Sequence, residues 1–202
     1  MNVYILNIDD ITDEMITSVA RQLPQRYAQS QKFKFEKGKR LSLGVGVLLL
    51  TVFPTIDESQ IYANEHGKLF LKNGEQFNVS HSGKFVVLVK DENPVGIDIE
   101  EIKAQNLLVA EKVFTPEERE WMNDDENLRF YTLWTQKESL VKAVGCGITI
   151  PLESFSVLPF EQNKPVSLQN ICWHNAIKQT GNYIVSVCAT TPIASLIFVE
   201  VR

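Results

Sequence analysis

Residues 96–100 read Gly-Ile-Asp-Ile-Glu, and this short alternating segment constrains the fold more than any other part of the sequence. On an extended strand, successive side chains point to opposite faces, so Ile97 and Ile99 share one side. Asp98 and Glu100 then share the other side. The sequence therefore predicts a strand with one apolar face and one acidic face.

A second segment, residues 134–142, has the character of a helix with charged groups on one side. It reads Trp-Thr-Gln-Lys-Glu-Ser-Leu-Val-Lys and contains neither Gly nor Pro. Glu138 and Lys142 are four residues apart, so on a helix they share a face. Lys137 lies on a different side of that helix, and we expect it to give structural support only.

The three carboxylates of these segments suit a divalent metal ion. Mg²⁺ prefers oxygen ligands in octahedral geometry and usually keeps several waters, so two or three carboxylates plus substrate phosphate oxygens complete a site. We expect Asp98, Glu100 and Glu138 to hold Mg²⁺ or Mn²⁺. The alternative is that the two strand acids are the solvated face of an edge strand and Glu138 is a surface residue, which is the usual meaning of a bare D-x-E pattern.

Both segments also complete a pair of signatures, G-[IV]-D-x-E followed by [FW]-[SCT]-x-K-E-[AS]-x-x-K. Two flanking segments, residues 77–83 and 151–155, match in the same order. In these motifs the chain resembles the 4'-phosphopantetheinyl transferases of the long, surfactin-synthetase-activating (Sfp) type. The resemblance is close over residues 77–157 and looser elsewhere.

The resemblance implies an α+β fold in which two similar α+β halves pack as a pseudo-dimer with the active site between them. We place the halves at residues 1–101 and 102–202. Hydrophobic patterning indicates helices followed by strands in each half. No repeat is visible at the level of residues, so the duplicated architecture comes from the resemblance. The length favours a monomer over an assembly of shorter chains.

Periodicity and turn signals predict the individual elements. Helices are expected over residues 11–29, 36–53, 106–113, 116–123 and 126–145. Strands are expected over residues 3–8, 60–63, 68–71, 84–90, 94–100, 155–158, 166–168, 183–188 and 196–201.

Composition excludes several classes of protein. A net charge of −5 and a pI near 5.3 argue against a binder of nucleic acid or of anionic membranes, because such partners require a basic surface. No export signal and no apolar run of the ~20 residues that cross a membrane is visible, so we expect a cytoplasmic protein. The three cysteines lack a C-x-x-C pattern and predict neither disulfides nor a zinc site.

The resemblance gives Lys142 and Glu118 catalytic roles. Lys142 would neutralise charge on a departing phosphate, or would only form an ion pair with Glu138. Glu118 would take a proton from the incoming hydroxyl. Residues 115–118 also read as a capping box, with Thr115 as N-cap and Glu118 reaching back to its amide. The base is therefore left open between Glu118, Glu138 and a metal-bound water.

Residues 32–40 hold five basic side chains and one acid, a local charge of +4 in an acidic protein. Such a run is commonly a solvated helix face, but the resemblance places Arg40 at the phosphates of coenzyme A, with Arg26 as a weaker candidate. It also places Ser80 and His81 there, with His81 as a donor near the 3'-phosphate. Lys68 would lie near the adenosine, although the residue after it is Leu where the family has Pro.

The implied reaction is attack by a serine hydroxyl of an apo acyl or peptidyl carrier protein on the β-phosphate of coenzyme A. Phosphopantetheine moves to the serine and 3',5'-ADP leaves. The carrier protein is expected beside residues 103–114, whose apolar side chains either contact it or face the core. Two other interpretations use the same residues, a magnesium-dependent phosphohydrolase and a non-catalytic binding module for coenzyme A or a carrier protein.

Overall fold

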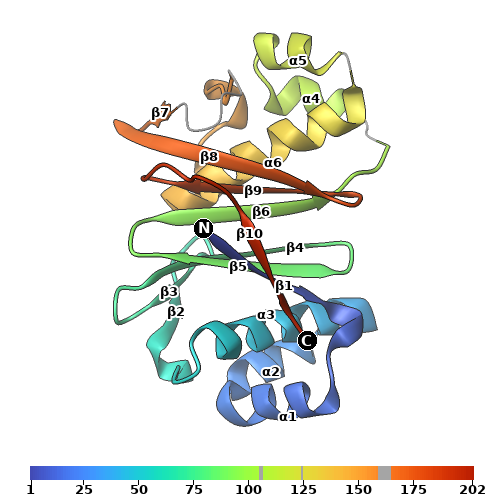
Figure 1. Ribbon diagram of the computed structural model, residues 1–202, viewed down its shortest axis with the longest axis vertical. Coiled ribbons are helices and arrows are strands. Elements are labelled where there is room, and N and C mark those ends of the chain that lie inside the picture. Colours follow the sequence, from blue (N-terminus) through green and yellow to red (C-terminus); the bar gives the residue numbers. More distant parts are fainter. Residues whose placement is uncertain (105–106, 124, 159–164) are drawn as a thin grey trace.

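The computed structural model describes residues 1–104, 107–123, 125–158 and 165–202, and over these residues helices and strands mix in an α+β fold, as predicted. Figure 1 shows two large sheets in the middle of the molecule and one group of helices beyond each of them. Whether the two halves are copies of one architecture stays a prediction.

Each large sheet has four strands. The first sheet has the order β10 (Ile197–Val201), β1 (Asn2–Asn7), β5 (Phe85–Asp91) and β4 (Gln76–Ser82). The second has the order β6 (Val95–Glu101), β9 (Tyr183–Ala189), β8 (Ile171–Thr180) and β7 (Val166–Leu168). β10 runs parallel to β1, and the other neighbours are antiparallel. A separate hairpin consists of β2 (Ile61–Ala63) and β3 (Leu69–Leu71).

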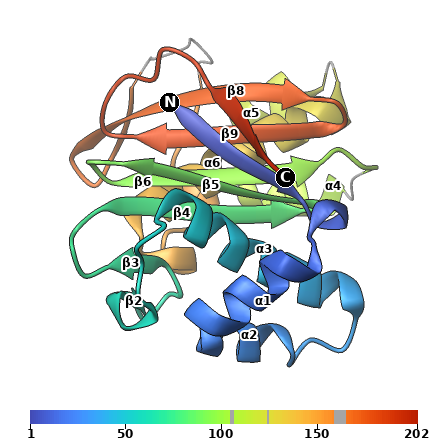
Figure 2. The ribbon, with the colours of Figure 1, turned by 60° about the horizontal axis from the view of Figure 1, so that its bottom comes forward.

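The helices form two groups. The first group is α1 (Asp13–Gln22), α2 (Pro24–Ser30) and α3 (Glu36–Val52). The second group is α4 (Leu107–Val113), α5 (Pro116–Met122) and α6 (Glu126–Val144). The first group packs on the sheet that contains β1, and the second packs on the sheet that contains β9. Figure 1 shows the resulting order of layers, helices, sheet, sheet and helices, and Figure 2 shows the first helix group below the strands of its sheet.

The alternation of side chains along the strands explains why the sheets are covered on both faces. On β5, Val86 and Leu88 pack with the first helix group, whereas Val87 and Val89 pack against the second sheet. All four side chains are 0% exposed. Burying each such aliphatic side chain contributes roughly 1.5–3 kcal/mol, so the strand is held from two sides.

The two sheets meet where β4 lies beside β6, and polar side chains make the junction. Asn78 Oδ1 accepts from the Ile97 amide at 2.9 Å, and the Ser82 hydroxyl accepts from the Glu101 amide at 3.1 Å. Between these two positions on β4 stands Ser80, which also bonds to β6. Every second residue of β4 therefore bonds to the other sheet, and this ladder supplies partners for polar groups that are buried.

The chain crosses between the sheets twice, once between β5 and β6 in the middle of the sequence and once between β9 and β10 near its C-terminal end. β6 belongs to residues 1–101 but lies in the second sheet, and β10 belongs to residues 102–202 but lies in the first. The predicted halves are therefore interlocked, and the division after residue 101 stays a prediction.

Two predicted elements differ from the structure, and two strands were not predicted. The single helix over residues 11–29 is two helices, because Leu23 leaves the helical region (φ −129°, ψ 62°) and Pro24, which lacks an amide hydrogen, starts α2. The strand predicted over residues 155–158 is absent from these described residues. β4 and β8 were not predicted as strands.

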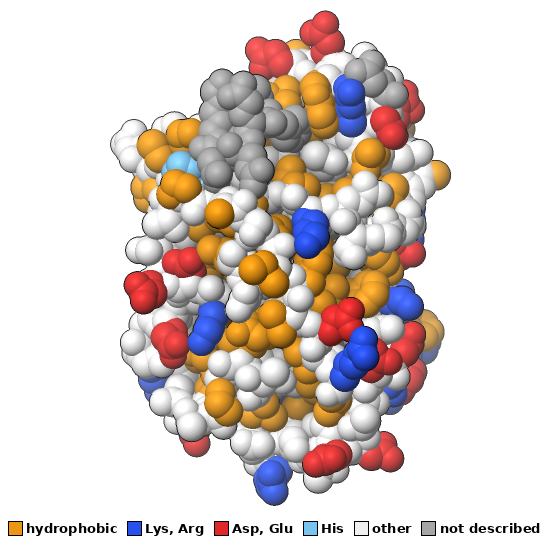
Figure 3. Space-filling model, in the orientation of Figure 1, with side chains coloured by type: hydrophobic (Ala, Val, Ile, Leu, Met, Phe, Trp, Pro, Cys, Tyr) orange, Lys and Arg blue, Asp and Glu red, His pale blue; other side chains and the backbone are white. Residues whose placement is uncertain are grey.

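None of the helices in the described ranges is long and apolar enough to cross a membrane. On the face shown in Figure 3, the basic side chains that are described do not gather into one continuous patch.

Candidate active site

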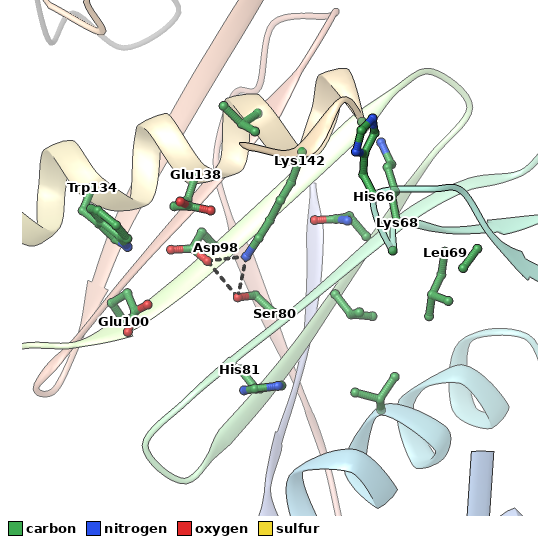
Figure 4. A pocket seen from close by; sticks show the side chains of 18 of the residues that line it. His66, Lys68, Leu69, Ser80, His81, Asp98, Glu100, Trp134, Glu138 and Lys142 are labelled. Carbon is green, nitrogen blue, oxygen red and sulfur yellow. Dashed lines mark hydrogen bonds and ion pairs between the residues drawn. The ribbon is translucent and has the colours of Figure 1, made fainter. Parts of the chain in front are cut away.

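A cavity of about 750 Å³ lies along the junction of the two sheets. Its walls come from α2, α3, β4, β6, α6 and the turn between β2 and β3. Figure 4 shows charged side chains from β6 and α6 converging in it, opposite His81 on β4. Of the predicted site residues, seven line the cavity: Lys68, Ser80, His81, Asp98, Glu100, Glu138 and Lys142.

The strand β6 presents its acids as the alternation predicts. Ile97 and Ile99 are 0% exposed and pack in the core between the sheets. Asp98 and Glu100 lie on the opposite face, toward α6 and the cavity. The apolar face of the strand therefore fixes the direction in which the carboxylates point.

The close approach of α6 to β6 depends on Gly96. A Cβ atom at this position would lie 2.0 Å from the Ser139 carbonyl oxygen and 2.4 Å from the Ala143 amide nitrogen. Both atoms belong to the backbone of α6, so any side chain at Gly96 would push the helix away. Because Gly96 has none, Glu138 and Lys142 lie directly across from Asp98.

The start and end of α6 are also fixed. The Asp125 side chain accepts from the Leu128 amide at 3.1 Å, which caps the first turn. Gly145 ends the helix in the left-handed conformation (φ 81°), where a side chain would be strained. The helix therefore presents its charged residues from a defined register.

Ser80, Asp98 and Lys142 form one hydrogen-bonded group at the base of the cavity. The Lys142 ammonium contacts Asp98 Oδ1 at 2.5 Å and the Ser80 hydroxyl at 3.0 Å, and Ser80 donates to the same Asp98 oxygen at 2.8 Å. The ion pair of Lys142 is thus with Asp98, rather than with the Glu138 of the alternative interpretation. This group joins one residue of each sheet to the helix.

The second oxygen of Asp98 has no partner. Oδ2 is buried and makes no hydrogen bond, although the side chain is 3% exposed. A buried acceptor without a partner is costly, by about 1–3 kcal/mol or more for a charged group. This oxygen is therefore available to a cation or to a donor that enters the cavity.

Burial and mutual repulsion shift the two glutamates in the same direction. Burial raises the pKa of Glu100, as do Asp98 and Glu138, whereas the hydrogen bond from Ser82 lowers it. Burial also raises the pKa of Glu138, with a further increase from Asp98 that Lys142 opposes. The cluster thus holds three acids against one ammonium, and additional positive charge would favour its ionised form.

These features fit a site for a divalent cation, as the sequence predicts. The donor set is carboxylate oxygen, which Mg²⁺ prefers, and Asp98 Oδ2 lacks a partner. Within the described residues, however, no three acidic, His or Cys side chains are already arranged as ligands of one ion. The metal roles of Asp98, Glu100 and Glu138 accordingly stay a prediction.

Two of the residues predicted to bind coenzyme A lie differently in the cavity. His81 projects from the exposed side of β4 and is available to a ligand. Lys68 is more enclosed, and its ammonium donates to the carbonyls of Ala143 at 2.9 Å and Val95 at 3.4 Å. Burial lowers the pKa of Lys68 to about 8.

Arg40 is not among the described residues that line the cavity. Its guanidinium donates to the backbone carbonyls of Ile8 at 2.8 Å and Ile11 at 3.1 Å. These bonds tie α3 to the short 3₁₀ turn after β1, which is a structural role. The predicted contact of Arg40 with coenzyme A stays a prediction.

Glu118 also lies away from the cavity. The side chain is 0% exposed, and its Oε2 accepts from the Thr115 amide at 2.8 Å and from the Lys137 ammonium at 2.8 Å. Its Oε1 accepts from the Val157 amide at 2.9 Å. Both oxygens are occupied, so the capping box is present and the structure does not bring Glu118 to the other carboxylates.

Lys137 has the structural role expected for it. Besides Glu118, its ammonium donates to the carbonyls of Leu152 at 2.7 Å and Phe155 at 2.5 Å. It thereby fastens α6 to α5 and to the segment after the helix.

The region predicted to contact a carrier protein contains both exposed and buried apolar side chains. On α4, Leu108 is 64% exposed and Val109 is 38% exposed, whereas Phe114 is fully buried in the core beneath α6. Residues 105–106 lie outside the described residues, as does the side chain of Leu107. One part of the segment therefore faces solvent and another part serves the core.

Sequence reasoning assigned no site role to several residues that line the cavity, and it gave Arg26 only as a weaker candidate for the phosphates of coenzyme A. Arg26 and Gln29 come from α2, Trp134 comes from α6, and His66 comes from the turn between β2 and β3. His66 packs closely on Gly147, where an added Cβ would lie 2.9 Å from the Cβ of His66, and no local pattern in the sequence reveals such a contact.

Comparison with known proteins defines the class to which this site belongs. The family model described as "4'-phosphopantetheinyl transferase superfamily" matches residues 94–188, which include β6 and α6. The chain is 31% identical over 185 residues to the 4'-phosphopantetheinyl transferase Sfp of Bacillus subtilis (strain 168), covering 84% of this chain and 82% of the relative.

Two further relatives agree. The chain is 30% identical over 217 residues to the 4'-phosphopantetheinyl transferase psf-1 of Bacillus pumilus, covering 96% of this chain and 92% of the relative. It is 36% identical over 141 residues to the 4'-phosphopantetheinyl transferase ffp of Bacillus subtilis, covering 64% of this chain and 62% of the relative. The chain belongs to the 4'-phosphopantetheinyl transferase superfamily.

Proposed function

We propose that this protein transfers the 4'-phosphopantetheine group of coenzyme A to a serine of an apo acyl or peptidyl carrier protein and releases 3',5'-ADP. The observation that carries the proposal is the linked group of Ser80, Asp98 and Lys142 at the base of a cavity that Glu100 and Glu138 also line. Family membership supports the same reaction.

The cavity suits a nucleotide-containing ligand. Its volume of about 750 Å³ lies within the usual range for small-molecule sites, roughly 300–1,000 Å³. Arg26, His81 and Lys68 line it and offer donors to phosphate oxygens. We assign Arg26 the phosphate contact that the sequence had suggested for Arg40, because α2 faces the cavity.

Asp98, Glu100 and Glu138 would hold Mg²⁺ or Mn²⁺. When bound, such an ion polarises a phosphoryl oxygen and orients the pyrophosphate. The raised pKa values of Glu100 and Glu138 support this assignment, since burial and the neighbouring acids outweigh the compensating charge of Lys142 at both carboxylates.

The chain's own residues would position the reactants and balance charge. The serine oxygen of the carrier protein forms a bond to the β-phosphorus, and the bond from that phosphorus to the bridging oxygen breaks. Lys142 would stabilise the charge that remains on 3',5'-ADP, since its ammonium already stands beside Asp98. The serine proton would go to a carboxylate of the cavity, and Glu138 suits this role better than Glu118, both of whose oxygens are occupied.

The carrier protein would approach over α4. Leu108 and Val109 are exposed there and could contact an apolar surface. We further expect the protein to act as a monomer in the cytoplasm.

The test is incubation of the protein with coenzyme A, Mg²⁺ and an apo carrier protein, followed by mass spectrometry of the carrier. We expect the carrier to gain one phosphopantetheine, and we expect the gain to disappear in chelator and in Asp98→Ala. Asp91→Ala, at the end of β5 and outside the cavity, is the matched control and should transfer normally.

The rival interpretations give other results. A phosphohydrolase would release nucleotide without a carrier, and a binding module would retain coenzyme A without changing it. Normal transfer by Asp98→Ala would contradict the metal assignment.

A further inference from the structure

The turn between β2 and β3 is hydrogen-bonded to the C-terminal end of α6. Lys68 donates to the Ala143 carbonyl, and the Asn64 side-chain amide donates to the Gly145 carbonyl at 2.7 Å. These contacts join residues that are about eighty positions apart in the sequence, and both carbonyls belong to the end of the helix. Figure 4 shows the turn, with His66 and Lys68, beside the end of the helix.

The contacts give hydrogen-bond partners to backbone carbonyls at the end of the helix. The last four carbonyls of an α-helix have no partner within the helix, and a cation near this end also interacts favourably with the helix dipole. At the end of α6, two donors from the turn take part of this role. The geometry of the helix end therefore depends on a segment outside the helix.

Asn64 connects the shape of the turn to the end of the helix. Its Oδ1 accepts from the backbone amides of His66 and Lys68, each at 3.0 Å, which holds the turn in place. Its Nδ2 makes the bond to Gly145. One side chain thus uses its acceptor within the turn and its donor on α6.

The end of α6 carries the charged group of the site. Lys142 directly precedes Ala143, and Glu138 lies about one turn earlier on the same helix. Asn64 itself is not among the described residues that line the cavity. An effect of Asn64 on the reaction must therefore pass through the position of the turn or of α6.

We propose that Asn64 is a positioning residue, which holds the end of α6 so that Lys142 stays in contact with Asp98 and Ser80. Its bond to the Gly145 carbonyl keeps the last turn of α6 from fraying. The consequence for catalysis rests on the proposed phosphopantetheinyl transfer, whereas the consequence for the helix end does not.

Asn64→Asp tests the bond in isolation. Aspartate keeps the acceptor for the two turn amides, so the turn should remain folded, and it replaces the donor to Gly145 by an oxygen that repels the Gly145 carbonyl. The matched control is Asn73→Asp in the turn after β3, where Asn73 Oδ1 accepts from the Glu75 amide at 3.1 Å and Nδ2 donates to Glu75 Oε2 at 2.6 Å. This variant introduces the same charge and also loses a donor, but the donor does not bind α6.

Two readouts separate the proposal from a general loss of stability. Hydrogen exchange of the Gly145 amide, which donates to Val141, should be about fivefold faster in Asn64→Asp. The kcat for transfer should fall roughly tenfold while KM for coenzyme A changes little, because the ligand contacts remain. Asn73→Asp should change neither quantity.

Unchanged exchange at Gly145 in Asn64→Asp would overturn the proposed role, whether or not transfer is observed. Faster exchange with unchanged kcat would overturn the link to Lys142. If the unsubstituted protein fails to transfer phosphopantetheine, the proposed function fails, and the exchange measurement still decides whether Asn64 holds the helix.

Discussion

Gly96→Ala tests whether the direct packing of α6 on β6 builds the site. The added Cβ would lie 2.0 Å from the Ser139 oxygen and 2.4 Å from the Ala143 nitrogen. Ordinary contacts at such atoms are about 3.2 Å or longer, so α6 and β6 must separate by roughly 1 Å. Since both obstacles are backbone atoms, no rotation of a side chain can relieve the clash.

The separation has two measurable effects. Overpacking of this kind costs about 1–3 kcal/mol, which corresponds to a fall in Tm of roughly 2–12 °C for a chain of this size. A displacement of ~1 Å at Lys142 can lower the rate about 100-fold. Thermal unfolding and the mass-spectrometric transfer assay measure these two quantities.

Gly38→Ala is the matched control. Gly38 lies within α3, and a Cβ there meets only the side chain of Phe33, which is 50% exposed and can move. Alanine also favours a helix over glycine by about 1 kcal/mol, so Tm should be unchanged or higher. If Gly96→Ala unfolds and transfers like the unsubstituted protein, the close approach of α6 is not what positions Lys142.

Three further predictions concern the charged groups. Because the folded pKa of Glu138 is raised, its ionised form costs stability at neutral pH, so in chelator Glu138→Gln should raise Tm and should gain less stability than the unsubstituted protein as the pH is lowered through the raised pKa. With Mg²⁺ present the same variant should lose transfer, and an unchanged Tm in chelator would count against the repulsion argument. Glu118→Ala should destabilise the protein by about 3–5 kcal/mol, because it leaves the buried Lys137 ammonium without its carboxylate. The folded fraction should still transfer at a rate near normal, and a loss of kcat at unchanged Tm would restore Glu118 as the base. Arg40→Met should lower Tm by removing the bonds to Ile8 and Ile11 while KM for coenzyme A stays the same, and a raised KM would show that Arg40 contacts the ligand after all.

The sequence predicted elements well where one pattern dominates. The alternation at Asp98 and Glu100 and the spacing of Glu138 and Lys142 are local, and each was confirmed because an apolar core on the other side fixes the direction of these side chains. Lys137 was likewise expected to be structural, and it is.

Long-range contacts explain what the sequence did not predict. β4 was not predicted as a strand because its inward residues, among them Asn78 and Ser80, are polar and bond to β6 rather than packing in an apolar core. Arg40 and Glu118 carry the charges that a site requires, but their partners are backbone groups and Lys137, which no spacing in the sequence reveals.

The polar ladder between β4 and β6 has a consequence for how this protein can change. Ser80 and Ser82 fasten one sheet to the other, and the same hydroxyls orient Asp98 and Glu100. A substitution that loosens the joint between the sheets must also alter the reactivity of the acids beside it. At these two serines, a substitution cannot change the stability of the sheet junction without also changing the turnover rate.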